Sequence, residues 1–359
     1  MMVALPGIEA RLASALAETP SRIPVLLGPC GSGRTRALQR VRDGLPPGSC
    51  HYIDVERVMA SPEQFLGRVT AESPLDWPAP GRPPVGPREA YDQALAYFTA
   101  ARASDRGPAT ILLDEALELR LFESFPGLSD VMTETLDRLA SSGNRFVLAT
   151  KYETRALCAL RKAPDRFLVV HAEPVSAPSV AADLLQVPGL RSDQAEDSAR
   201  VIIALTEGRA AYVAALVGAL AAVPERDLDP VAALTALLSP GGALHARCRF
   251  SYEMRLHRAR GYGALKAVLG ILAEEEPLTL TEIAGRVRRT PGSTRDYLGW
   301  LEDVDLVSAQ RKRYAFADPL LRVWVRLNSR CAPPDPDRTL DEIQRYAVAR
   351  LSAGLVNPR

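Results

Sequence analysis

The fold class is indicated by one segment of the chain, Ile23-Pro24-Val25-Leu26-Leu27-Gly28-Pro29-Cys30-Gly31-Ser32-Gly33-Arg34-Thr35. An apolar run precedes a glycine-rich turn, so we expect a short buried strand, a loop and a helix that begins near Arg34. Glycines let such a backbone turn tightly and aim its amides at phosphate oxygens, and the helix N-terminus adds a positive dipole end. The pattern predicts a phosphate-binding loop. We expect Gly28–Thr35 and the adjacent Arg36 to bind a nucleoside triphosphate, with ATP the first candidate.

Arg34 stands where this loop pattern usually has lysine. Arginine is cationic and can contact the β- and γ-phosphates, but its planar fork differs from the compact charge of an ammonium. We therefore expect binding to survive and turnover to be slower. The alternative is a glycine-rich strand-to-helix turn that holds no ligand.

A second apolar run, Thr110–Leu113, ends in Asp114-Glu115. A carboxylate at the end of a buried strand can lie beside the first loop, so we expect Thr35 and Asp114 to hold Mg²⁺. Glu115 is the candidate that polarises an attacking water. The alternative is that both acidic residues only cap the following helix.

Thr150 ends a third apolar run, Phe146–Thr150. A hydroxyl at this position can touch the γ-phosphate or the attacking water, although many strands end in threonine without such a role. Glu115, Arg34 and Thr150 are therefore the candidate catalytic residues.

Further apolar runs at 51–55 and 167–170 alternate with helical patterns, which indicates an α/β fold with a parallel sheet covered on both faces. Residues 73–87 contain six prolines and are expected to form an irregular insertion. After about residue 175 the chain is rich in alanine and leucine, and its pattern is helical.

The composition is that of a soluble globular protein with two or three domains. The 359 residues are 47% hydrophobic and 24% charged, with a net charge of +1. The overall charge therefore does not indicate a nucleic-acid partner. Five scattered cysteines favour a reducing compartment. No signal peptide and no long apolar run is present, so we expect a cytoplasmic protein without a membrane partner.

Residues 280–301 carry a helix-turn-helix pattern, followed by a predicted hairpin with arms at 303–309 and 313–317. Double-stranded DNA is a possible partner of its basic residues, which are Arg288, Arg289, Arg295, Arg311, Lys312 and Arg313. Nearby acidic residues dilute this charge. A solvated hairpin tip and a protein-binding module therefore stay open as alternatives.

Gly28–Thr35, Asp114-Glu115 and Phe146–Thr150, in this order, resemble the AAA+/STAND group of P-loop ATPases over residues 20–235. Residues 206–212 resemble the lid-helix motif of that group, with Ala210 in place of its proline and Ala211 in place of its sensor-2 arginine, unless Arg209 substitutes. Tyr314–Trp324 resembles the ending of archaeal-type members, which place a winged helix after the lid.

The resemblance implies a P-loop NTPase core at 1–175, a helical lid at 176–240, a linker at 241–262, a winged helix at 263–330 and a helical tail at 331–359. It implies an ATPase or ATP-driven switch that uses ATP and Mg²⁺ and releases ADP. A homo-oligomer is possible, in which a neighbour's Arg155 or Arg161 completes the site. The alternatives are a DNA-binding, initiator-like regulator that hydrolyses ATP poorly, and an interaction scaffold.

Overall fold

A computed structural model describes residues 6–18, 20–187, 190–222, 228–259, 261–329 and 334–356. The chain divides into two compact units, which are described separately here. The first, called the sheet unit, contains the described residues up to Pro29 together with Gly33–Glu173. The second, called the helical unit, contains Cys30–Ser32 and the described residues from Pro174 onward.

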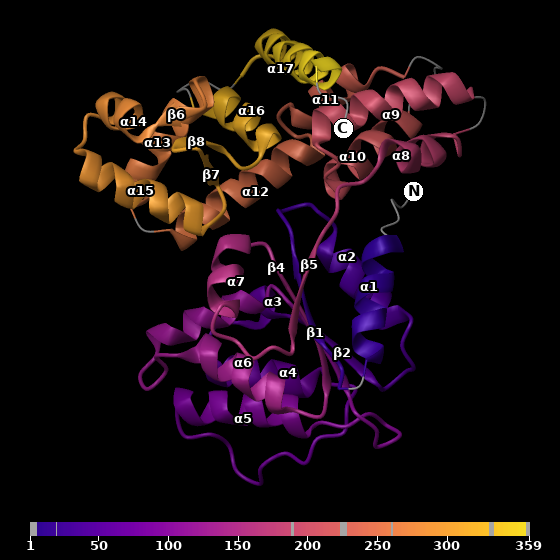
Figure 1. The fold of residues 1–359 in the computed structure, drawn as a ribbon, viewed down its shortest axis with the longest axis vertical. Helices are drawn as coiled ribbons and strands as arrows, with labels where there is room; N and C mark the ends of the chain where they lie inside the picture. Colours follow the sequence, from indigo (N-terminus) through magenta and orange to yellow (C-terminus); the bar gives the residue numbers. More distant parts are fainter. Residues whose placement is uncertain are drawn as a thin grey trace. The chain divides into compact units, whose positions relative to one another are not determined.

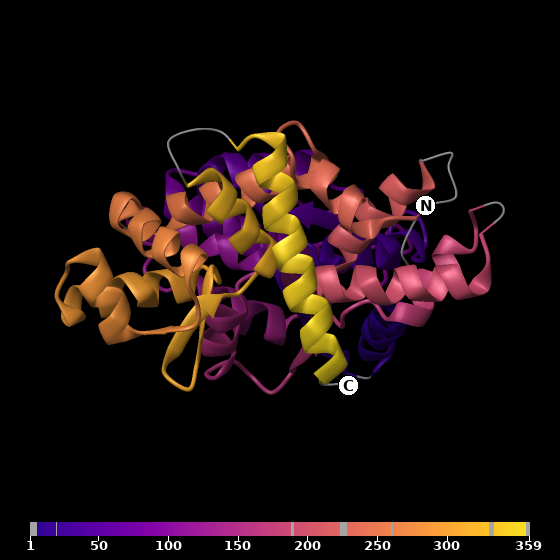
Figure 2. The same ribbon diagram turned by 90° about the horizontal axis from the view of Figure 1, so that it is seen from above.

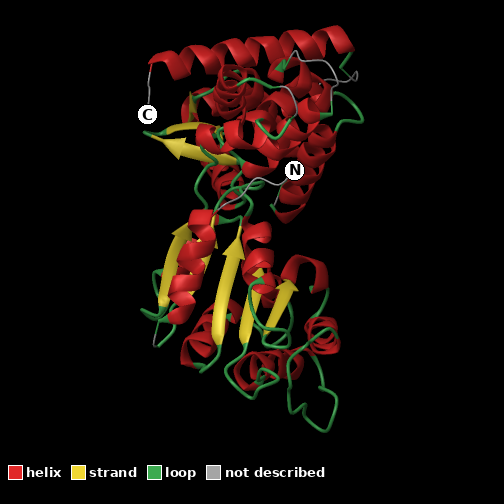
Figure 3. Cartoon of the chain, turned by 90° about the vertical axis from the view of Figure 1, so that its right-hand side faces the viewer, coloured by secondary structure: helices red, strands yellow, loops and turns green. Residues whose placement is uncertain are grey.

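The sheet unit contains a parallel five-stranded sheet in the order β2-β3-β4-β1-β5, and its arrows run in one direction in Figure 3. The strands are β1 (Ile23–Leu27), β2 (Cys50–Asp54), β3 (Thr110–Asp114), β4 (Arg145–Thr150) and β5 (Phe167–His171). The predicted α/β class with a parallel sheet is confirmed. The expected strand at 51–55 starts and ends one residue earlier, because Val55 begins a short helix that the Asp54 carboxylate caps by accepting from the Arg57 amide.

Helices cover both faces of this sheet, with α1 and α2 on one face and α3 to α6 on the other (Figure 1). The helical elements are α1 (Pro6–Ala17), α2 (Arg34–Asp43), α3 (Val55–Val58), α4 (Pro62–Ala71), α5 (Pro87–Ala100), the 3₁₀ helix η1 (Ala116–Ser124), α6 (Val131–Ser141) and α7 (Glu153–Leu160). Every residue of β1 and of β3 is buried. Burial on both faces is the reason that these strands have continuous apolar sequences rather than alternating ones.

Among the described residues from Pro174 onward, six helices precede a segment that mixes short strands and helices. The elements of the helical unit are α8 (Ala177–Leu184), α9 (Ser192–Thr206), α10 (Ala210–Ala221), α11 (Pro230–Leu238), α12 (Ala243–Arg258), α13 (Tyr262–Glu274), β6 (Leu278–Thr279), α14 (Leu280–Val287), α15 (Pro291–Asp303), β7 (Val307–Gln310), β8 (Arg313–Phe316), α16 (Pro319–Asn328) and α17 (Pro336–Val356). The three short strands form an antiparallel sheet in the order β6-β8-β7.

Helix α17 packs on α9, α11 and α16 within the helical unit and is the long yellow helix in Figure 2. It starts at Pro336, where a proline costs no helical hydrogen bond. The predicted first hairpin arm at 303–309 is shorter in the structure, because α15 continues to Asp303 and β7 begins at Val307.

Within the described ranges, no helix is both long and apolar enough to cross a lipid bilayer. The described cysteines Cys30, Cys50, Cys158 and Cys248 form no disulfide with one another. Cys331 lies outside the described residues.

His51 gives the sheet unit a pH-dependent stability. The ring is buried on β2, its Nδ1 lies 2.6 Å from the Tyr97 hydroxyl oxygen, and burial lowers the pKa of His51 from 6.5 to about 4. Because the folded pKa lies below the unfolded one, stability is complete above the unfolded value and is lost as the pH falls towards the folded value. We expect a loss of about 2 kcal/mol between about pH 7 and about pH 5.

Urea unfolding at the two pH values measures this loss. His51→Gln removes the titrating group and should reduce the difference between the two unfolding free energies by that amount. A difference that the substitution leaves unchanged would assign the pH dependence to other groups.

Candidate nucleotide-binding site

The predicted strand, loop and helix are present, with the loop joining β1 to α2. Gly31 and Gly33 have φ of +86° and +93°, in the left-handed region that side chains with a Cβ rarely adopt. Gly33 is the N-cap of α2, and Arg34 is its first helical residue. The amides of this first helical turn have no partner in their own helix and are therefore suited to an anion.

The ends of three strands bring the candidate residues together. β4 lies between β1 and β3, and Leu27 is the register partner of Thr150. Asp114 is the last residue of β3 and Thr150 the last of β4. Since the carboxyl ends of parallel strands meet at one edge of a sheet, these two residues lie at the edge from which the loop departs.

Asp114 is buried and hydrogen-bonded to the first turn of α2. Its carboxylate accepts from the Thr35 hydroxyl and, at 2.9 Å, from the hydroxyl of Tyr52 on β2. Burial raises the pKa of Asp114, and the bonds from Thr35 and Tyr52 oppose that rise. The paired carboxylate and hydroxyl are hard oxygen donors that fit Mg²⁺. Sequence reasoning missed Tyr52, which precedes Asp54 on a strand with no recognised motif.

Arg34 and Glu115 form a buried ion pair. Nη2 of Arg34 lies 2.7 Å from Oε1 of Glu115, and the two side chains are 6% and 11% exposed. Nη1 of the same guanidinium donates to the carbonyl oxygens of Gly28 and, at 2.7 Å, of Pro29. The arginine expected to contact phosphates thus binds the carboxylate expected to activate water.

Glu115 does not act as a helix cap through its side chain. It precedes η1 with a left-handed backbone (φ 53°, ψ 43°), and its carboxylate makes no capping hydrogen bond. Such a backbone costs a non-glycine residue about 1 kcal/mol, which the bonds to Arg34 and Lys151 offset. Burial acts to raise the pKa of Glu115, but the charges of Arg34 and Lys151 outweigh it and leave this pKa below its ordinary value.

Lys151 is a site residue that sequence reasoning missed. Its backbone amide donates to Oε2 of Glu115 at 3.1 Å, and its ammonium lies 2.9 Å from a carboxylate oxygen of Glu56 and 3.7 Å from one of Glu118. Burial acts to lower the pKa of Lys151, but Glu115, the neighbouring Tyr152 and Glu56 raise it above its ordinary value. The only sequence signal was its position directly after Thr150.

Thr150 is buried, and its Oγ1 accepts a hydrogen bond from the Tyr152 amide at 3.2 Å. The hydroxyl therefore holds the turn that follows β4. Contact of Thr150 with a nucleotide stays a prediction.

Arg209 is held inside the helical unit. Its Nη1 lies 3.0 Å from Oδ2 of Asp318, its Nη2 donates to the Ala317 carbonyl, and the two side chains of the ion pair are 8% and 4% exposed. Tyr212 also donates to Oδ2 of Asp318, at 2.7 Å. Arg209, the candidate to substitute for the sensor-2 arginine, thus binds the residues at the start of α16.

The six candidate DNA-contacting residues are all exposed and come from three places in the helical unit. Arg288 and Arg289 follow α14, Arg295 lies on α15, and residues 311–313 lie at the turn between β7 and β8. Arg311 and Lys312 have left-handed φ of 50° and 64°, as a tight two-residue hairpin turn requires. Arg313 also donates to the Pro277 carbonyl at 3.1 Å.

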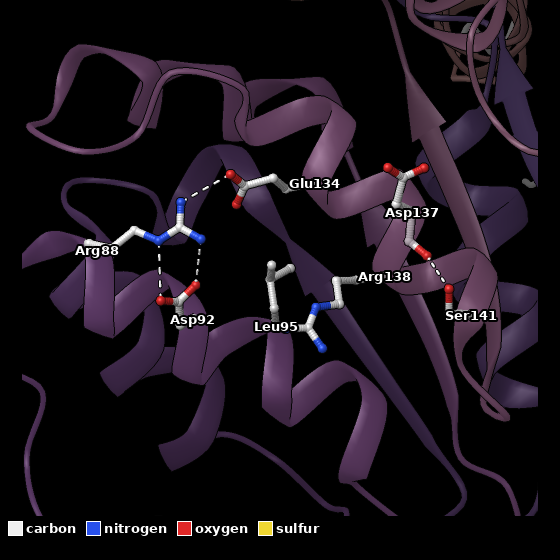
Figure 4. Close-up of a pocket in the computed structure, with 7 residues that line it drawn as sticks. All are labelled: Arg88, Asp92, Leu95, Glu134, Asp137, Arg138 and Ser141. Atoms are coloured by element: carbon white, nitrogen blue, oxygen red, sulfur yellow. Dashed lines mark hydrogen bonds and ion pairs between the residues drawn. The ribbon is translucent and has the colours of Figure 1, made fainter.

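A separate polar pocket lies between α5 and α6 (Figure 4). Arg88 bridges Asp92 and Glu134 across it, at 2.9 and 3.0 Å. Its lining contains none of the predicted nucleotide-site residues, so it adds nothing to the nucleotide assignment.

The fold is similar to that of a solved Walker-type ATPase. This ATPase of Pyrococcus abyssi superposes over 90% of this chain and 96% of its own, with a TM-score of 0.65 and 14% identity. The similarity shows that the two chains share a fold. No protein-family model and no curated protein sequence matches the chain significantly.

Two further solved structures superpose less well on this chain. One is to a STAND protein of Pyrococcus horikoshii with a tetratricopeptide repeat sensor, at 12% identity over 95% of this chain and 45% of that chain, with a TM-score of 0.34. The other is to Drosophila ORC bound to DNA, at 10% identity over 86% and 90% of the two chains, with a TM-score of 0.42.

Proposed function

We propose that the chain binds ATP with Mg²⁺ and hydrolyses it, as an AAA+/STAND-type ATPase or nucleotide-driven switch. The observation that carries this proposal is the meeting of the phosphate loop, the Thr35–Asp114 pair and Glu115 at one edge of the parallel sheet. Nucleotide sites of α/β folds lie at such an edge, beyond the carboxyl ends of the strands.

In this proposal, Gly28–Thr35 and Arg36 bind the phosphates. Thr35 and Asp114 would hold a Mg²⁺ ion, which would neutralise charge that develops on the phosphates. Glu115 accepts a proton from water as the water oxygen bonds to the γ-phosphorus. The bond from that phosphorus to the β–γ bridging oxygen breaks, and ADP and inorganic phosphate leave. Thr150 orients the water or the γ-phosphate.

The proposal includes domain boundaries at residues 175, 240, 262 and 330. It also includes a cytoplasmic location, and a homo-oligomer in which a neighbour's Arg155 or Arg161 contributes to the site. Arg155 stacks over the Tyr152 ring at 5.3 Å, and Arg161 is exposed beyond α7.

Equilibrium binding of a fluorescent ATP derivative tests this function. We expect Mg²⁺-dependent binding by the wild-type chain. Asp114→Asn should raise the Mg²⁺ concentration needed for half-maximal ATP binding about tenfold, because a charged ligand is replaced by a neutral one of the same shape. Asp92→Asn, in the pocket between α5 and α6, is the matched control and should bind as the wild type does. A wild-type chain that binds no ATP with or without Mg²⁺ rejects the function.

Double-stranded DNA is a second candidate ligand, favoured by a specific feature of the helical unit. The six exposed basic residues at 288, 289, 295 and 311–313 form no ion pairs with the described residues. Cations without carboxylate partners suit phosphate contacts. A nucleotide-binding regulator with little hydrolysis is the functional alternative that this feature supports.

Charge reversal at the hairpin turn tests the DNA candidate. We expect Arg311→Glu with Lys312→Glu to weaken binding of a short DNA duplex at least about tenfold and to lower the salt dependence of its dissociation constant. Arg345→Glu is the control, because it reverses one positive charge on α17, away from the hairpin turn. DNA affinity that both substitutions lower equally would indicate net charge rather than a specific surface.

A further inference from the structure

The guanidinium of Arg34 is bound to protein acceptors through both terminal nitrogens. Nη1 donates to two carbonyl oxygens of the phosphate loop, and Nη2 lies 2.7 Å from Oε1 of Glu115. The planar fork permits this bridge, whereas a lysine has one nitrogen and lacks the second arm. The departure from the usual lysine therefore places a cation of the loop on the candidate general base.

The two carboxylate oxygens of Glu115 have different partners. Oε1 binds Arg34, while Oε2 accepts from the Lys151 amide at 3.1 Å and lies 3.9 Å from the Lys151 ammonium. Departure of Arg34 would expose Oε1 and leave Oε2 held. The carboxylate would then keep its direction and gain an oxygen that can accept a proton from water.

We propose that nucleotide phosphates and Glu115 compete for Arg34, so that binding of a triphosphate transfers this arginine from Oε1 to a phosphate oxygen and unmasks the general base. Lys151 is a positioning residue that holds Glu115 after the exchange. This inference rests on the proposed nucleotide-binding function and adds a regulatory step to the same site.

The charges around Lys151 set the direction of the exchange. Three carboxylates, those of Glu56, Glu115 and Glu118, lie within 4 Å of its ammonium. Removal of Arg34 increases the excess of negative charge in this cluster, which is costly without compensation. Arg34 therefore stays on Glu115 until an anion of higher charge competes for it, and the base is masked when the phosphates are absent.

Binding of a fluorescent ADP derivative with Mg²⁺ tests the exchange. ADP has no γ-phosphate, so binding is measured without hydrolysis. Glu115→Gln should tighten ADP binding about tenfold, since a neutral amide competes weakly for a guanidinium. Glu123→Gln removes a carboxylate of equal shape that pairs with Arg120 outside the cluster around Lys151, and we expect its affinity to stay within about twofold of the wild type. In an Arg34→Met background, Glu115→Gln should no longer tighten binding.

The outcomes separate this inference from the function on which it rests. A wild-type chain that binds ADP, together with a Glu115→Gln variant of unchanged affinity, overturns the exchange and leaves the nucleotide site intact. Equal tightening by Glu123→Gln also overturns it, because the effect would then be a general loss of negative charge. A wild-type chain that binds neither ADP nor ATP rejects the proposed function itself.

The role of Lys151 has its own readout. Lys151→Met removes the ammonium 3.9 Å from Oε2 of Glu115 and keeps the bond from the backbone amide. It should lower kcat about tenfold at nearly constant KM, because Glu115 is then oriented less firmly and keeps its contact with substrate. Lys151→Arg should restore most of kcat. A change in KM alone, or no rescue by arginine, contradicts a positioning role.

Discussion

Glu115→Gln should abolish most of the ATP hydrolysis, with kcat lowered about 10²- to 10⁴-fold, while ATP binding is retained. Glutamine keeps the shape of the side chain but cannot accept the proton of the attacking water. The carboxylate is the one held between Arg34 and Lys151. Release of phosphate under saturating ATP and Mg²⁺ measures the effect.

Glu123→Gln is the matched control for this substitution, because Glu123 lies on η1 and pairs with Arg120 at the surface. We expect it to leave kcat unchanged. Hydrolysis by Glu115→Gln at the wild-type rate would show that the proton goes elsewhere and would remove Glu115 from the mechanism.

Asp318→Asn should lower the free energy of unfolding of the helical unit by about 3–5 kcal/mol. Oδ1 of Asp318 accepts from the amides of Leu320 and Leu321 at the start of α16, a task that asparagine performs equally well. Oδ2 binds Arg209 and Tyr212, and the neutral amide would remove the nearer counter-charge of the buried guanidinium, leaving the carboxylate of Glu207 at 3.9 Å. The loss therefore reports the ion pair and not the helix cap.

Urea unfolding followed by circular dichroism measures this loss. Arg209→Met combined with Asp318→Asn should cost less than the sum of the single substitutions, because neither partner is left as an uncompensated charge. Glu275→Gln breaks the exposed pair with Arg286 and should cost at most about 0.5 kcal/mol. Additive losses for the buried pair would show that Arg209 and Asp318 do not stabilise each other.

Local sequence predicted the elements whose determinants are close together in the chain. Ile23–Leu27 and Gly28–Thr35 carry a strand, a loop and a helix start within thirteen residues, and glycine at 31 and 33 meets the left-handed backbone that the loop requires. Asp114 and Thr150 were located because each ends an apolar run. Apolar periodicity and glycine placement act over short distances, so a single sequence reveals them.

Contacts between distant residues were out of reach of that reasoning. Glu56 and Lys151 are 95 positions apart, and Arg209 and Asp318 are 109 apart. Each pair depends on which strands or helices become neighbours, and the strand order β2-β3-β4-β1-β5 follows from packing both faces of the sheet and not from any one segment. Periodicity gives the elements, whereas their order depends on the burial of all of them together.

The phosphate loop combines features that local sequence predicts with contacts that form only between distant residues. A glycine-rich turn that leads into a helix at Arg34, and an acidic pair that ends a buried strand, can both be predicted from the amino-acid sequence. The buried ion pair between Arg34 and Glu115, separated by 81 positions, is seen in the folded chain and not in either segment. The side chains of parallel strands and their loops meet at one sheet edge, where burial makes each charge depend on its neighbour.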